Sequence, residues 1–573
     1  MKDSSSSLSS SLSLSPGGIS ELLILKIINY IEYNQDIVCL LMTCKAYYRE
    51  FKKKYAQVIT FKDIDTQSTS QRSIIGTYMR PFKDIYNASL ATIRTNKNHE
   101  IANPPPQTST TLSRTSVEAI EFLKTIKDTT KLTTLVLNGF TGDIKDVLLA
   151  SVDTMVIDIK VHVPRFPTIS QWTCALTHLT IQSSRIIPIV HLPPTLEDLV
   201  INYRCRDIFS LDLSNLVALK QLHIMTLCPT PIPASNILLP NPNTSLTLLN
   251  LKMLLDPTSI NQSFFPPNLE RFFGDQSLFA TTNIKPPQKA TSIAIGGIMK
   301  KIPPNFFPPC LLELDLILDN DSTVLDPWVF PHGLEILDIP HFSVKMSPEF
   351  VPDSVVRLEV NVENPEFAIF PSGLISFTTS TNHESPFNYP PTLRHLEYAK
   401  CQHPPPFIYL PTSLETFQCI ITNSKGTPFI YTLPSTLVIN NDNTSPTDNP
   451  LHFILPSRLA KLIIYKDGPE NESFSIRIDP IINCSNVQHL SITNIGPRLD
   501  IHIRRLDNGD VLLNSGDTFF GGIYRQRRME STTFGNRSPL DFRALYLNFK
   551  LNGNHFNLYP SNTPIKSIDT NII

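Results

Sequence analysis

This chain lacks long apolar runs, a cysteine pattern and a strong net charge. It has no apolar run of about 18 residues, the length at which a transmembrane helix is predicted. Its nine cysteines include no Cys-x-x-Cys pair, so we interpret them as small core residues of a reducing compartment. A formal net charge of −2 gives no general attraction to nucleic acid or to an anionic membrane.

Glycine is scarce, with 19 residues, whereas proline is abundant, with 49. A flexible low-complexity chain would be rich in both. The length of 573 residues is too great for one compact core and suits an array with end pieces. Residues 1–18 are serine-rich without the apolar stretch of a signal peptide, so we expect a disordered tail and a cytoplasmic location, with the nucleus left open.

Catalytic motifs are also missing. The sequence contains no His-Glu-x-x-His, no Gly-x-Ser-x-Gly and no phosphate-binding Gly-x-x-x-x-Gly-Lys. The glycine cluster at 516–522 lacks a lysine and follows a hairpin pattern, which predicts a turn. We therefore expect no enzyme activity, no catalytic residue, no cofactor and no metal site, and we expect neither nucleic acid nor membrane as a partner.

The chain does contain a repeat of about 22 residues, of the type Pro-x-Leu-x-x-Leu-x-Leu. Clear copies begin at Pro194, Pro309 and Pro391. The first apolar positions of the units are residues 132, 152, 176, 196, 219, 246, 269, 290, 311, 334, 355, 374, 393, 414, 437, 459 and 487. A fixed period of this length predicts a solenoid, in which each unit buries its apolar face by stacking on its neighbours.

Elementary chemistry accounts for each unit. Proline cannot donate a backbone hydrogen bond, so it marks the start of a strand. The Leu-x-Leu positions alternate inward and outward, as in a half-buried strand. The predicted fold is a repeat solenoid with a parallel sheet of short strands, spanning 115–492 with a capping helix over 117–126. The phrases "LPPTLEDLVI", "FPPCLLELDL" and "YPPTLRHLEY" resemble leucine-rich repeats and, more closely, FNIP repeats. That resemblance implies a protein-binding role.

Residues 19–61 follow a different pattern, with two amphipathic helices separated by 34–36, where Asp36 is a candidate cap. The segment "ILKIINYI", a polar break and "DIVCLLMTCKAYYREF" resemble an F-box. The resemblance implies docking to the Skp adaptor of an SCF-type ubiquitin ligase. The matching positions are Leu23, Ile27, Ile28, Ile31, Asp36, Leu40, Cys44 and Lys45. A plain helical hairpin that caps the first strands is the alternative. Residues 62–114 are expected to be a linker or a partly ordered segment.

Residues 493–573 carry two hairpin patterns and are predicted to form a β-rich cap. Strand-like alternation surrounds Asn508-Gly509 and Asn552-Gly553, which favour tight turns. Arg504 and Arg505 are interpreted as a charged strand edge.

One candidate binding site follows from the register of the repeats. The residue between the two inward positions of each strand faces the exposed side of the sheet. Acidic residues gather at this position, namely Asp315, Asp338, Glu359 and Glu397. They form either a groove for a basic peptide or loop of a target protein, or an ordinary solvated face.

Two functions remain open at this point. In the first, the solenoid binds a protein target while the F-box-like module docks a ubiquitin-ligase core. In the second, the protein is a scaffold without a ubiquitin link, and its N-terminal helices only cap the array.

Overall fold

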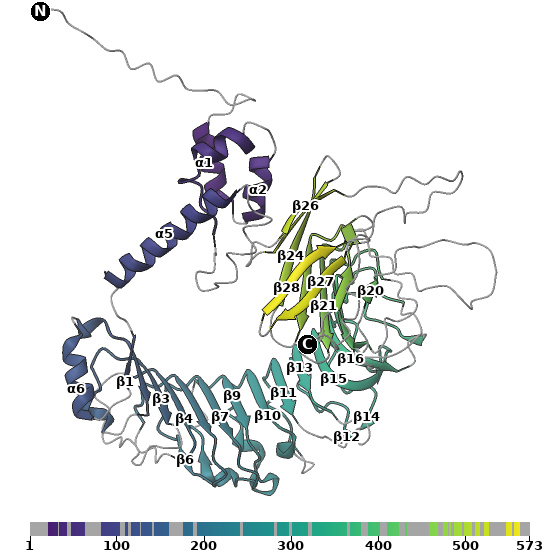
Figure 1. The fold of residues 1–573 in the computed structure, drawn as a ribbon. Coiled ribbons are helices and arrows are strands. Elements are labelled where there is room, and N and C mark those ends of the chain that lie inside the picture. Colours follow the sequence, from purple (N-terminus) through teal and green to yellow (C-terminus); the bar gives the residue numbers. More distant parts are fainter. Residues whose placement is uncertain are drawn as a thin grey trace, which may run out of the picture. The chain divides into compact units, whose positions relative to one another are not determined.

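The computed structural model is shown in Figure 1. It describes residues 21–31, 34–42, 47–62, 82–102, 109–112, 116–126, 128–139, 143–159, 176–186, 192–240, 245–279, 284–296, 301–318, 324–363, 367–379, 388–401, 410–422, 430–432, 458–467, 474–478, 481–482, 486–494, 498–506, 510–515, 521–525, 546–552 and 555–561. The chain forms two compact units. Unit 1 contains 1–103 and 399–573, and unit 2 contains 104–398.

Unit 2 is a parallel β-solenoid, as the repeat predicts. Each strand of its main sheet pairs in parallel with the strand of the neighbouring repeat. The strands are β1 (Ser109–Leu112), β2 (Thr134–Asn138), β3 (Thr154–Ile159), β4 (His178–Ser183), β5 (Asp198–Tyr203), β7 (Gln221–Thr226), β9 (Leu248–Lys252), β10 (Arg271–Asp275), β11 (Ser292–Gly296), β13 (Glu313–Leu316), β15 (Ile336–Lys345), β16 (Arg357–Glu363), β17 (Ser376–Thr379) and β18 (His395–Cys401). Two short parallel pairs accompany them: β6 (Leu211–Asp212) with β8 (Ile237–Leu238), and β12 (Lys301–Ile302) with β14 (Val324–Leu325).

The prolines start the strands through a recurring turn. In one repeat the amide of Leu311 donates to the carbonyl of Pro308 at 3.2 Å, and Pro309 occupies the following position. The same bond recurs at the corresponding prolines of other repeats, from Pro193 to Pro411. Proline at the second position fits this turn because its fixed φ is already the one required. The turn then delivers an apolar side chain to the core.

The core consists of the predicted inward positions. Sixteen of the seventeen first apolar positions lie in the described residues, and each of these sixteen is at most 1% exposed. The remaining one, Leu437, lies outside the described residues. In β10 the second inward position is Gly274, because the ring of Phe272 fills the space. A Cβ atom on Gly274 would lie 2.4 Å from Cζ of Phe272.

The expected helix over 117–126 is present as α6 (Ser116–Thr125). Strand β1, which the repeat does not predict, precedes this helix and pairs with β2. β1 lies in the segment expected to be a linker, as does the helix α5 (Lys83–Ala102). The composition of 62–114 gives no clue to these elements, because their apolar residues are few and depend on partners distant in sequence.

Unit 1 contains parallel strands followed by antiparallel ones. β19 (Thr416–Thr422), β21 (Lys461–Asp467) and β23 (His489–Asn494) pair in parallel. β24 (Arg498–Arg505), β25 (Asp510–Ser515) and β26 (Gly521–Arg525) then pair antiparallel. A second sheet contains β20 (Ile430–Thr432), β22 (Phe474–Arg477), β27 (Tyr546–Asn552) and β28 (His555–Ser561). The β24–β25 and β27–β28 pairs confirm both predicted hairpins.

Two expectations for unit 1 need correction. The repeat at Leu437 predicted a strand between β19 and β21, but these two strands pair directly. Arg505 is not an edge charge, because its guanidinium donates to the carbonyls of Ile481, Ile482 and Val487 at 2.8–3.0 Å. It satisfies backbone acceptors that the preceding segment leaves open.

The N-terminal helices of unit 1 share one apolar core. They are α1 (Glu21–Tyr30), α2 (Asn34–Met42), a π-helical turn (Tyr47–Phe51), α3 (Lys52–Lys54) and α5. Their core contains Ile28, Phe51 and Ile85, and also Leu512 from β25. The described helical core therefore includes a residue of the C-terminal strands. No described helix is both long enough and apolar enough to cross a membrane.

The start of α2 differs from the expectation. The helix begins at Asn34, so Asp36 lies within its first turn and is not its cap. The side chain of Asn34 instead binds the backbone of Lys62. Its Oδ1 accepts from the Lys62 amide at 2.8 Å, and its Nδ2 donates to the Lys62 carbonyl at 2.7 Å.

Candidate binding face

A single column of side chains runs along the outward side of the unit 2 sheet. Its members occupy the middle of consecutive strands, and the strand pairing puts each opposite the next. In order they are His223, Asn250, Phe273, Ala294, Asp315, Asp338, Glu359, Thr378 and Glu397. The four acidic residues, here called the acidic ladder, therefore lie in one register with Thr378 between the last two.

The acidic ladder lies on the surface but is only partly solvated. Asp315 is exposed, whereas Asp338, Glu359 and Glu397 are half-buried. Burial, together with the charges of Glu359 and Asp315, raises the pKa of Asp338 to about 6, against the opposing effect of Arg357. Partial desolvation by neighbouring atoms also raises the pKa of Asp315 despite its exposure, and burial with the charge of Glu397 raises that of Glu359. Keeping these carboxylates charged on this face therefore costs free energy.

Within the described residues, the charge of Arg357 offsets that of Asp338 and Glu359 only in part. Asp315, Asp338 and Glu359 form no ion pair there. The Oδ1 atom of Asp338 is buried without a hydrogen-bond partner. Parallel strands lie about 4.8 Å apart, so the like charges of neighbouring rungs repel. A cation supplied from outside would relieve this repulsion.

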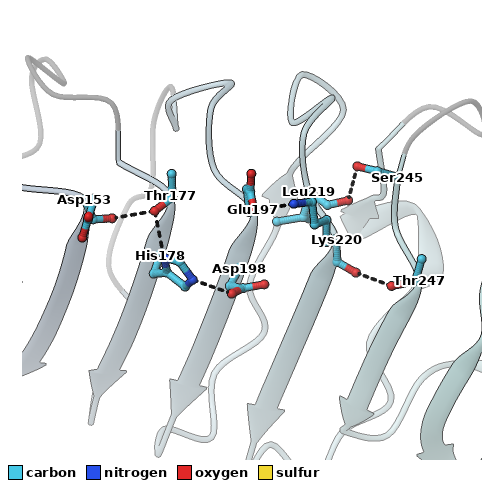
Figure 2. A network of polar contacts seen from close by, with 9 residues as sticks. All are labelled: Asp153, Thr177, His178, Glu197, Asp198, Leu219, Lys220, Ser245 and Thr247. Carbon is cyan, nitrogen blue, oxygen red and sulfur yellow. Dashed lines mark hydrogen bonds and ion pairs between the residues drawn. The ribbon is translucent and has the colours of Figure 1, made fainter.

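Figure 2 shows a contrasting polar network at the starts of strands earlier in the sheet. Nε2 of His178 lies 2.8 Å from Oδ2 of Asp198, and Nζ of Lys220 lies 2.6 Å from Oε2 of Glu197. The hydroxyl of Thr177 also contacts Nδ1 of His178 at 2.8 Å. Asp198 and Glu197 thus pair directly with basic side chains, whereas Asp315, Asp338 and Glu359 form no ion pair within the described residues.

The candidate adaptor residues fall into three groups. Leu23 and Ile27 are 50% and 43% exposed on α1. Ile28 is fully buried, and Ile31 and Leu40 pack partly buried against the same core. Asp36 lies in α2, and Cys44 and Lys45 lie outside the described residues. The sequence match thus combines surface positions with core positions.

The exposed apolar surface of α1 extends beyond the matched residues. Leu22 is 67% exposed and Tyr30 is 76% exposed, on a helix whose opposite face is buried by Ile24, Leu25 and Ile28. Glu21 at the start of α1 accepts from Nζ of Lys54 and from the hydroxyl of Tyr55, both at 2.6 Å. These contacts hold α1 against the following helices, and its outer face exposes these apolar side chains together with Lys26 and Asn29.

Comparisons with known proteins find only distant structural similarity. No family model matches the sequence, and no curated protein matches it. One similar solved structure is described as CroV588, a novel circular LRR protein, with 17% identity and a TM-score of 0.33 over 64% of this chain. Another is YopM from Yersinia enterocolitica WA-314, with 18% identity and a TM-score of 0.30 over 63% of this chain. The alignments span 57% of the first structure and 71% of the second.

Proposed function

We propose that the protein is a non-enzymatic interaction protein whose solenoid binds a basic segment of a protein target along the acidic ladder. The observation that supports this most strongly is the register of Asp315, Asp338 and Glu359, which are stacked on the outward face and form no ion pair among the described residues. A surface that concentrates carboxylates without ion pairs favours a cationic partner.

The geometry suggests the kind of segment that would fit. From Asp315 to Glu397 the ladder covers five strands, and the four spacings between them add up to about 19 Å. An extended chain advances about 3.3 Å per residue, so about six residues cross this distance. Basic side chains at alternate positions would all face the ladder, because side chains of an extended segment alternate between its two sides.

The test uses an eight-residue peptide of alternating arginine and serine and the full-length protein. The variant combines Asp315→Asn, Asp338→Asn, Glu359→Gln and Glu397→Gln. Exposed ion pairs contribute roughly 0.2–1 kcal/mol each, so we expect about tenfold weaker binding by this variant at low salt. Binding by the wild type should also weaken as salt rises, because screening shortens the reach of the charges.

A matched control neutralises acidic residues away from the ladder. Glu197→Gln with Asp212→Asn removes two carboxylates from the same unit, and peptide affinity should stay within twofold of wild type. Equal peptide affinity of the wild type and the ladder variant at low salt would show that the acidic ladder is an ordinary solvated face.

We propose, as a second function, that α1 docks the Skp adaptor of an SCF-type ubiquitin ligase. The exposed apolar side chains of Leu22, Leu23 and Ile27 support this docking, in addition to the F-box resemblance. The scaffold alternative, in which the helices only cap the array, predicts no adaptor binding.

The adaptor test changes only exposed residues. Leu23→Lys with Ile27→Lys should abolish co-precipitation of the Skp adaptor while leaving the fold intact. Lys26→Ala, on the same helix, should retain it. Ile28→Lys is unsuitable because Ile28 is fully buried and its loss would unfold the module. The full-length chain is required, since the helical core includes Leu512. Failure of wild-type protein to bind the adaptor would support the scaffold alternative.

A further inference from the structure

A hollow of about 620 Å³ lies at the carboxyl ends of strands β7 to β13, at one end of the acidic ladder. Its walls include Phe273 of β10, Asp315 of β13 and Ile317 just after β13. Lys252 of β9 lies at the opposite rim. A volume of this size is within the usual range for sites that take a small group, roughly 300–1,000 Å³.

The hollow exists because β11 presents two small residues on its outward side. Ala294 and Gly296 stand between the larger residues of β10 and β13. Packing does not demand the glycine: a Cβ atom on Gly296 would meet only Cδ1 of Ile317, at 3.8 Å. Gly274 in the neighbouring strand is different, since its missing side chain makes room for Phe272. The space above Gly296 is therefore open toward solvent.

The walls combine apolar surface with two carboxylates, Asp275 of β10 and Asp315 of β13. Ile317 is 56% exposed and Leu227, also in the wall, is 65% exposed. The ring of Phe273 is half-buried beside them. Asp315 lies at the edge of this surface and is the first residue of the acidic ladder. Lys252 lies three strand spacings, about 14 Å, from Asp315. Its positive charge repels a cation at its own rim of the hollow and leaves the rim at Asp315 favourable.

We propose that this hollow receives the side chain of one arginine from an extended basic segment of a target protein. The guanidinium contacts Asp315, and the aliphatic stem packs against Phe273 and Ile317. This inference rests on the proposed function of the acidic ladder and specifies its anchor residue. Arginine fits better than lysine because its planar, weakly hydrated guanidinium stacks on aromatic rings and forms bidentate contacts with carboxylates.

The test compares two peptides, one alternating arginine with serine and one alternating lysine with serine, on the full-length protein. Wild type should bind the arginine peptide about fivefold more tightly. Gly296→Val places a branched side chain on the floor of the hollow without disturbing the core, and it should remove this preference while leaving binding of the lysine peptide unchanged. Ser292→Val is the matched control: it adds the same side chain on the same strand, outside the hollow, and should keep the preference.

A second variant at another position shows whether the effect of Gly296→Val could come from misfolding. Ala294→Leu closes the hollow from the adjacent outward position, and both variants should keep the wild-type thermal midpoint. An arginine preference that survives both substitutions would overturn the anchor proposal while leaving the acidic ladder intact. Failure of wild type to bind either peptide would overturn the ladder proposal and the anchor together.

Discussion

Asp338→Asn should stabilise unit 2 at neutral pH. The substitution removes the charge of a half-buried carboxylate while keeping its shape, so the unpartnered Oδ1 atom remains polar. The pKa of Asp338 is raised from 3.8 to about 6, a difference that corresponds to roughly 3 kcal/mol if none of it is screened. Because the side chain is only half-buried, solvent screening reduces the expected gain to about 1–2 kcal/mol.

The pH dependence of this effect has a definite sign. The folded state binds the Asp338 proton more tightly than the unfolded state, because the folded pKa lies above the unfolded one. The cost of the charge is fully present above about pH 6 and disappears as the pH falls toward 3.8. Wild type should therefore become more stable relative to Asp338→Asn between pH 7.5 and pH 5, as the free-energy difference between the two shrinks.

Tryptophan fluorescence is a suitable assay, because Trp172 and Trp328 both belong to the sequence of unit 2. Thermal unfolding of wild type and Asp338→Asn at the two pH values gives the difference directly. Glu313→Gln, an exposed acidic residue two positions before Asp315, is the control and should change little. A variant less stable than wild type at pH 7.5, or a difference independent of pH, would refute the reasoning.

Two further substitutions test the packing. Gly274→Val should lower the thermal midpoint of unit 2 by several degrees, because its Cβ would lie 2.4 Å from Phe272, and Phe272→Leu should restore part of the loss; a midpoint equal to that of Gly296→Val would contradict this packing. Leu512→Ala should destabilise the N-terminal helices by about 2–5 kcal/mol, seen as faster hydrogen exchange in α1 and α5. Leu513→Ala is its control, and unchanged exchange in both would show that β25 does not support the helices.

The sequence predicts the solenoid well because its signal is local and repeated. Each Leu-x-Leu pair indicates which side chains point inward. Because Leu314 and Leu316 are buried on the inward side, Asp315 between them must lie on the outward side. The register of the acidic ladder follows from the same rule. Both hairpins are also local, since two residues separate β27 from β28 and four separate β24 from β25.

The features missed by the sequence depend on contacts between distant segments. Nothing near Leu512 indicates that it belongs to the helical core, and nothing near Asn34 indicates its clamp on Lys62. The direct pairing of β19 with β21 also contradicts the local repeat at 437. The hollow beside Asp315 arises from small residues on one strand between large ones on two others, which becomes visible only when the strands are aligned.

The most direct measurement of the central claim locates the bound basic segment on the protein. A photo-crosslinking amino acid at Thr378, within the acidic ladder, should capture the alternating arginine–serine peptide at low salt and lose it at high salt. The same amino acid at Phe367, which is 77% exposed in the same unit but outside the ladder, should capture little. Equal capture at both positions, or capture at Phe367 alone, would contradict binding along the ladder.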